Sequence, residues 1–174
     1  MRLFIAINFE NEVKQKIIAL QQQLGKQGSG NFSRPENLHL TLAFLGEVSS
    51  LRIITVKSIL NSLTVRPITL TFNRTGFFKR EGGDIIWLGI SENRALNALQ
   101  SCLTSKLNAE GFKTEKRTFE PHLTLVRQYV LNNGEGRINP SFEHFTSLID
   151  TVSLMVSERL YGRLVYREIY RKST

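Results

Sequence analysis

The chain has 174 residues, of which 41% are hydrophobic and 22% are charged, a composition that suits one globular domain with a core of its own. Its single cysteine, Cys102, excludes an internal disulfide, and no apolar run approaches the ~20 residues of a membrane span. The formal net charge of +8 favours an anionic partner, nucleic acid first, although it can also serve solubility alone. We expect a monomeric, cytoplasmic, single-domain protein over residues 1–174 that has no contact with membranes.

The first half of the chain predicts a strand, a helix, a loop and a second strand. Residues 2–9 are β-branched and aromatic, and the helix after them is expected to end at Gly25. Residues 25–37 hold three glycines and a proline, so we expect a loop there. The second strand covers residues 39–45. The apolar stripe of the predicted helix is formed by Val13, Ile17, Leu20 and Leu24.

The second half predicts the same elements in the same order. Residues 84–91 predict a strand, Ser91 is the expected cap of the next helix, and a basic loop leads to a strand at residues 122–127. The apolar stripe of this helix is formed by Leu96, Leu99, Leu103 and Leu107. Cys102 is expected to pack among these leucines. Three aromatic residues are expected in the core, with base stacking as the alternative for one of them: Phe44, Phe77 and Trp87.

The tetrapeptide His-Leu-Thr-Leu occurs twice, at residues 39–42 and 122–125, and the two copies are 83 residues apart. The same shift places Phe4 on Trp87 and Arg34 on Arg117. The chain therefore reads as two copies of one α/β unit. Because similar halves usually pack about a pseudo-twofold axis, we expect the two copies of the tetrapeptide to meet as two sides of one site.

Side chains alternate across a strand, so His39 and Thr41 are expected on one face and Leu40, Leu42 and Phe44 on the other. The same holds for His122 and Thr124. Two imidazoles can supply an acid and a base at neutral pH, and two hydroxyls can donate hydrogen bonds to phosphate oxygens. In-line displacement at phosphorus needs a base on one side and an acid on the other. The duplicated motif therefore predicts metal-free phosphoryl chemistry.

A lone His-x-Thr on a strand is more often structural than catalytic. The duplication of the motif favours the catalytic interpretation here. No cysteine cluster accompanies the motifs and no carboxylate stands at ligand spacing, so no metal and no cofactor are expected. The third histidine, His144, lies outside both motifs and is expected to be structural.

The chain resembles the two-histidine (2H) phosphoesterases, and within them the RNA 2′,3′-cyclic phosphodiesterases, also called 2′-5′ RNA ligase-like or LigT-like proteins. The resemblance rests on the stretches "RLFIAI", "HLTLAFLG", "IIWLGI" and "PHLTLVR", which occur in the family's order. It implies an α/β (α+β) fold with two lobes of antiparallel-rich sheet and helices around a central active-site cleft. It also implies hydrolysis of a 2′,3′-cyclic phosphate at an RNA end, tRNA fragments included, to a 2′-phosphate.

The resemblance assigns His39 as the acid and His122 as the base, with Thr41, Thr124 and Arg127 on the phosphate. Basic residues beside the motifs are expected to hold the RNA backbone: Arg34, Lys116 and Arg117. Two alternatives stay open. One is a 2′-5′ RNA ligase that acts on tRNA halves with the same four motif residues, and the other is a non-catalytic module that binds RNA or a nucleotide.

Overall fold

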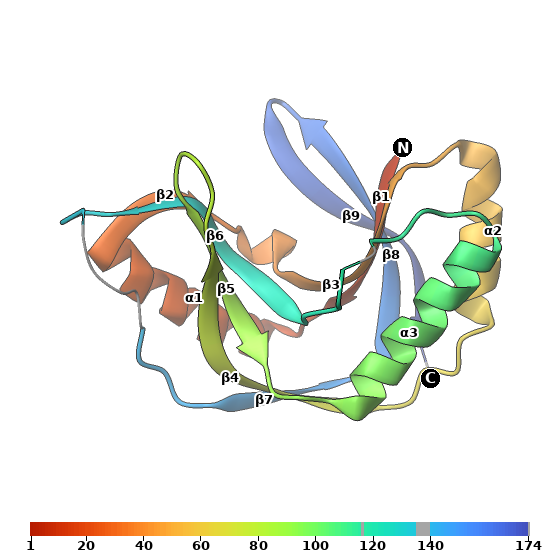
Figure 1. Ribbon diagram of the computed structural model, residues 1–174, viewed down its shortest axis with the longest axis horizontal. Coiled ribbons are helices and arrows are strands. Elements are labelled where there is room, and N and C mark those ends of the chain that lie inside the picture. The colour runs from red at the N-terminus through yellow and green to blue at the C-terminus, as the bar shows by residue number, and fades with distance from the viewer. Residues whose placement is uncertain (116, 135–139, 174) are drawn as a thin grey trace.

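The computed structural model describes residues 1–115, 117–134 and 140–173, and Figure 1 shows its course. Its first half contains β1 (Arg2–Asn8), α1 (Asn11–Gln27), β2 (Gly28–Phe32), the 3₁₀ helix η1 (Pro35–Asn37), β3 (His39–Glu47), α2 (Ser50–Asn61) and β4 (Ile68–Phe78). Its second half contains β5 (Asp84–Ile90), α3 (Arg94–Ala109), β6 (His122–Leu131), β7 (Phe145–Ile149), β8 (Thr151–Leu160) and β9 (Arg163–Ser173). Among the described residues, no helix is both long enough and apolar enough to cross a membrane.

The strands form two antiparallel sheets, and each sheet takes strands from both halves of the chain. The four-stranded sheet has the order β3-β1-β8-β9, and the five-stranded sheet has the order β2-β6-β5-β4-β7. The series β3-β1-β8 and β6-β5-β4 are equivalent under the 83-residue shift, which confirms the two pseudo-symmetric halves. The last strand of each repeat has crossed to the other sheet, so the two lobes are not the two contiguous repeats.

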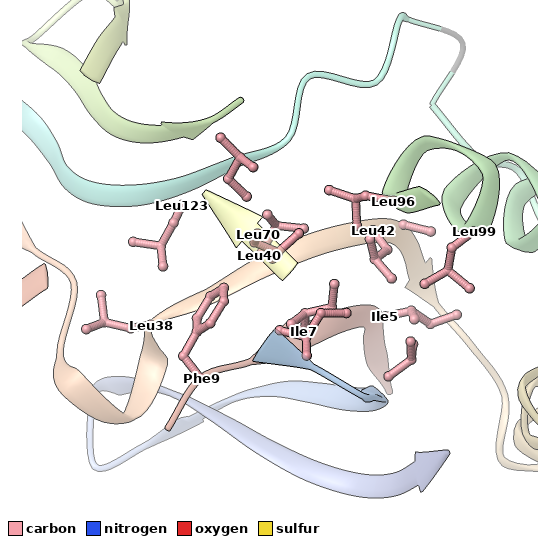
Figure 2. Close-up of a cluster of buried hydrophobic side chains, with 14 of the residues drawn as sticks. Ile5, Ile7, Phe9, Leu38, Leu40, Leu42, Leu70, Leu96, Leu99 and Leu123 are labelled. Atoms are coloured by element: carbon pink, nitrogen blue, oxygen red, sulfur yellow. The ribbon is translucent and has the colours of Figure 1, made fainter. Parts of the chain in front are cut away.

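The helices cover one face of the sheets and enclose a single core. Helix α1 contacts β2 and β6, whereas α3 contacts β3 and α2. Figure 2 shows the core side chains meeting from β1, β3, β4, β6 and α3, among them Ile5, Leu40, Leu70, Leu96 and Leu123. The predicted apolar stripes of α1 and α3 are buried as expected, and each fully buried leucine contributes roughly 1.5–3 kcal/mol. This continuous core fixes both sheets relative to each other.

Residues 28–32 were expected to lie in a loop, and this expectation was wrong. They form β2, which pairs with β6 along the edge of the five-stranded sheet. The two glycines permit close packing rather than a turn: a Cβ on Gly28 would lie 2.5 Å from the Tyr129 ring, and one on Gly30 would lie 2.7 Å from Val126. Helix α1 correspondingly runs to Gln27, two residues beyond Gly25.

Three other expectations about side chains were also wrong. Asn93, not Ser91, is the N-cap of α3, and its side chain accepts a hydrogen bond from the Leu96 N–H at 3.0 Å. Cys102 lies on the exposed side of α3, outside the leucine stripe. Phe44 and Phe77 are about half exposed rather than in the core. Only Trp87 of the three aromatic residues is buried, and it lies outside the main hydrophobic cluster.

Candidate active site

The two copies of the motif open two strands that meet where the sheets adjoin. His39 is the first residue of β3 and His122 is the first residue of β6, and the two strands contact each other (Figure 1). In both strands the leucines of the motif are buried while the histidine and threonine are partly exposed. The expected alternation therefore holds over the four motif residues. We call the side that carries both His-x-Thr pairs the histidine face.

The backbone holds both imidazoles in the same way. Nδ1 of His39 donates to the carbonyl of Asn37 at 2.7 Å, and Nδ1 of His122 donates to the carbonyl of Glu120, also at 2.7 Å. Because a carbonyl can only accept, the proton of each neutral ring sits on Nδ1 and leaves a lone pair on Nε2. Each Nε2 can therefore take a proton as a base, or give one back as an acid once the ring is charged.

The two rings differ in their neighbours. The His39 ring lies against Phe4 and Tyr166, with centroids 4.9 and 5.0 Å away, and its Nε2 accepts a hydrogen bond from the Thr41 hydroxyl at 3.0 Å. The His122 ring lies 5.2 Å from Phe78 and 5.9 Å from Trp87. No partner of His122 Nε2 is found among the described residues.

Burial lowers the pKa of His39 from 6.5 to about 4. The hydrogen bond to the Asn37 carbonyl raises the pKa against this trend, while the charges of Arg127 and His122 lower it further. Strands β3 and β6 contact each other and the charges of Arg127 and His122 act on His39, so the structure brings these three predicted site residues together. Without a neighbouring anion to offset this shift, the His39 ring is neutral at neutral pH.

Equivalent bulges bring Phe44 and Arg127 onto the histidine face, which strand alternation does not predict, although the family resemblance had assigned Arg127 to the phosphate. On β3, Thr41 pairs with Ala6 and Ala43 pairs with Ile5, so Leu42 has no partner. On β6, Thr124 pairs with Trp87 and Val126 pairs with Ile86, so Leu125 has none.

Each bulge buries two consecutive residues and turns the next one outward. Phe44 was expected on the leucine face with Leu40 and Leu42. This was wrong, because strict alternation along a strand does not allow for the extra residue of a bulge. The adjacent apolar pairs Leu42-Ala43 and Leu125-Val126 were the available signal, since they interrupt the alternation in both motifs at the same place. Phe44 and Arg127 are thus equivalent positions with different chemistry.

Trp87 lies flat on the histidine face because two glycines make room for it. A Cβ on Gly76 would lie 2.2 Å from the indole, and one on Gly89 would lie 2.7 Å from it. Its indole packs against Phe78 with centroids 5.6 Å apart. The indole ring therefore forms part of the wall beside His122.

Two of the predicted RNA-contacting residues, Arg34 and Arg117, lie in the loops that lead to the motifs, where the structure does not bring them into contact with the histidines. Arg34 precedes η1 and lies 3.8 Å from the Glu36 carboxylate, and Arg117 pairs with Glu115 at 2.6 Å. Lys116 lies outside the described residues. Both described arginines are partly exposed, so neighbouring carboxylates offset their charge without enclosing it.

Elsewhere the described residues contain no group of three or more histidine, cysteine, aspartate or glutamate side chains that could hold a metal ion. His144 lies near Phe142, with ring centroids 6.2 Å apart, away from both motifs. It therefore offers a natural control for the two motif histidines.

Comparison with known proteins places this geometry in a family. A family model described as LigT like Phosphoesterase matches residues 7–87 and again residues 88–166. The chain is 34% identical to an RNA 2′,3′-cyclic phosphodiesterase of Escherichia coli K12, over 98% of this chain and 94% of that protein. It is 36% identical to a protein of the same name from Thermotoga maritima, over 73% of this chain and 70% of that one.

Solved structures agree with these sequence matches. Escherichia coli LigT in its apo form superposes with a TM-score of 0.83 at 29% identity, over 99% of this chain and 96% of that one. The same protein complexed with 3′-AMP superposes with a TM-score of 0.82 at 29% identity, over 99% and 97%. The similarity covers both sheets and both copies of the motif.

Proposed function

This chain belongs to the LigT-like phosphoesterase family, and from this premise we propose that it hydrolyses 2′,3′-cyclic phosphates at RNA ends to 2′-phosphates. One observation carries the proposal: two imidazoles on one face, each with Nδ1 bound to a carbonyl and Nε2 left for proton transfer. Binding alone needs no such matched pair. The names of the relatives and the net charge of +8 both favour RNA as the substrate.

Hydrolysis requires the removal of one proton from the attacking water and the donation of one proton to the leaving oxygen. Water attacks phosphorus opposite the bridging 3′-oxygen, and His122 Nε2 takes a proton from that water. The bond from phosphorus to the 3′-oxygen breaks, and His39 Nε2 gives a proton to the departing oxygen. The products are a 2′-phosphate and a free 3′-hydroxyl. Each proton transfer of this kind is worth roughly 10²–10⁴-fold in rate.

The lowered pKa of His39 constrains when it can act as the acid. Its ring is neutral at neutral pH, and the negative charge of a bound phosphodiester favours the imidazolium form. The substrate therefore helps to charge the group that protonates its leaving oxygen. The assignment of acid and base is inherited from the family resemblance, and a substrate with a better leaving group tests it, as described in the Discussion.

Three further residues serve the phosphate. Arg127 is turned toward the histidine face by its bulge, so its guanidinium can bind two non-bridging oxygens at once. Thr124 can donate its hydroxyl hydrogen to the same oxygens as charge develops in the transition state, and Thr41 can do so once a protonated His39 no longer accepts its hydrogen bond. Phe44 stands at the equivalent bulge on β3 with an exposed ring, where it can stack on the terminal base.

Ligation opens the same cyclic phosphate with the same groups, with a 5′-hydroxyl in place of water as the nucleophile, and no observation in this structure favours it over hydrolysis. We further propose that Arg34, Lys116 and Arg117 hold the RNA backbone, which a fall in RNA affinity between low and physiological salt tests. A monomeric state and a cytoplasmic location stay predictions.

The direct experiment incubates the protein and EDTA with an RNA oligonucleotide that ends in a 2′,3′-cyclic phosphate. The expected product carries a 2′-phosphate, identified against 2′- and 3′-phosphate standards. Retained turnover in EDTA supports the metal-independent mechanism. Activity that vanishes in EDTA and returns with a divalent ion overturns it, and a wild-type protein without any turnover overturns the proposed function.

A further inference from the structure

A row of three residues crosses the five-stranded sheet beside the second histidine. Arg74 on β4 pairs with Gly89 on β5, and Gly89 pairs with His122 on β6. These strands run side by side in Figure 1. Paired residues of adjacent antiparallel strands point to the same face, so Arg74 lies on the histidine face with only a glycine between it and His122.

The Arg74 side chain lies over Gly89. A Cβ on Gly89 would lie 2.9 Å from both Cγ and Nε of Arg74, so this side chain occupies the space that a residue at position 89 would fill. The row through His39 is different, because His39 pairs with Asn8 on β1 and the Asn8 amide donates to the Glu168 carboxylate at 3.2 Å. Arg74 therefore places a cation in the row of the second histidine, where the row of the first holds an amide bound to a carboxylate.

Arg74 also borders a cavity of about 190 Å³ beside His122. Its polar lining comes from Arg74, Glu92, Asn93, Asn97 and Glu120. The volume is below the ~300–1,000 Å³ of pockets that take whole ligands, so it suits one ring system. Glu120 connects the cavity to the catalytic group, since its carbonyl accepts the Nδ1 proton of His122.

The polar groups of this cavity differ in whether they already form hydrogen bonds or ion pairs within the described residues. The Asn93 side chain is engaged, because it accepts from the Leu96 N–H and donates to the Thr69 carbonyl at 2.9 Å. Within the described part of the chain, Arg74 forms no ion pair. The Glu92 and Glu120 carboxylates would repel a phosphate inside the cavity, but they can accept hydrogen bonds from the amino groups of a nucleobase.

We propose that Arg74 and this cavity form a subsite for the nucleotide that precedes the cyclic-phosphate end of an RNA. The guanidinium binds the phosphodiester that joins the last two nucleotides, and the base of the preceding nucleotide enters the cavity. This inference rests on the proposed function, since an RNA end with a cyclic phosphate extends only in the upstream direction. With this subsite, the protein hydrolyses RNA ends more efficiently than cyclic mononucleotides.

The test compares a nucleoside 2′,3′-cyclic phosphate with a dinucleotide that ends in the same group. We expect R74Q to lower kcat/KM for the dinucleotide about tenfold more than for the mononucleotide, which is the effect of losing one charge-assisted hydrogen bond. R74K should recover part of this loss because it keeps the charge. Lys79→Gln, one residue past the end of β4 and away from the row, should leave the ratio of the two kcat/KM values as in the wild type.

Equal losses on both substrates, or no loss on either, would overturn the subsite. Thermal unfolding of R74Q shows whether a lower rate reflects misfolding, and the ratio between substrates is unaffected by the fraction of active protein. A wild-type protein inactive on both substrates would instead contradict the proposed function. In that case, direct binding of a dinucleotide phosphate to wild type and R74Q still tests the subsite, and equal affinities would overturn it.

Discussion

The two histidine strands share a backbone and differ in what surrounds it. Each begins at its histidine, each holds Nδ1 on the carbonyl two residues earlier at 2.7 Å, and each has a bulge directly after the second leucine. The residue that the bulge exposes is Phe44 on one strand and Arg127 on the other. The shared backbone supplies two proton-transfer groups, and the different neighbours give each of them its own environment.

The difference extends to charge and solvation. His39 is enclosed by Phe4 and Tyr166 and its pKa falls to about 4, whereas His122 faces the side that carries Arg127 and Arg74. A perfectly symmetric pair would have no preferred acid and no preferred base. The repeated strand thus provides the geometry of the site, and the different neighbours make its two imidazoles chemically unequal.

The largest expected effect comes from removing either imidazole. His39→Ala and His122→Ala should each lower kcat by roughly 10²–10⁴-fold, and the double variant should be little worse because the pair acts as a unit. Turnover of the cyclic-phosphate RNA measures this. His144→Ala is the matched control and should keep wild-type turnover. A folded His122→Ala protein with near-normal turnover would end the two-histidine account.

The residues after the bulges should respond unequally, with Arg127 the more sensitive. Arg127→Ala removes a cation that stabilises the phosphoryl oxygens, so kcat should fall about 10²–10³-fold. Arg127→Lys should restore only part of the rate, because lysine does not reproduce the bidentate contact. Steady-state kinetics on one substrate compares the variants. A loss confined to KM would show that Arg127 only binds the ground state.

The lowered pKa of His39 makes stability depend on pH. The unfolded chain has the ordinary His pKa of about 6.5 and so binds a proton that the native His39 resists until about pH 4. Stability from this group is complete above pH 6.5 and is lost as pH falls toward 4, by roughly 3 kcal/mol at most. Denaturant unfolding of wild type and H39Q between pH 7 and 4 measures it. If the difference in unfolding free energy between them stays constant, His39 is not a buried neutral ring.

The smallest of these effects is expected at Phe44. Base stacking on an aromatic ring is worth ~1–3 kcal/mol, so Phe44→Ala should lower kcat/KM by about tenfold, and Phe44→Tyr should stay near wild type. The control is Phe77→Ala, which removes another exposed phenyl ring outside the two motif strands. If both phenylalanine variants lose the same activity, stacking at the bulge is not the cause.

Periodicity predicted β1, β3, β5, β6, α1 and α3 and the pairing of the two motifs, because these depend on which residues are apolar and how often they recur. The stripes of α1 and α3 and the burial of Leu40 and Leu123 followed directly. The repeat also predicted that two histidines would face one site. It did not predict that β4 and β8 exchange sheets, since the choice of partner strand is not encoded in the pattern of one strand.

The remaining errors come from contacts between strands. Residues 28–32 have the composition of a loop, and only the close approach to β6 explains their glycines. The bulges depend on a missing partner at Leu42 and Leu125, and they decide where Phe44 and Arg127 point. Arg74 reaches the site across Gly89, which lies on another strand. Such effects belong to pairs of strands and are absent from the pattern of a single one.

The most direct test of the account uses a cyclic substrate in which sulfur replaces the bridging 3′-oxygen. A thiol has a pKa near 8.5 and leaves as an anion without the proton that an alcohol needs. If His39 is the acid, His39→Ala should approach wild-type turnover on this substrate, within about tenfold, while His122→Ala stays at least ~100-fold slower because water still needs its base. Recovery of His122→Ala instead, or of neither variant, would contradict the division of roles between the two histidines.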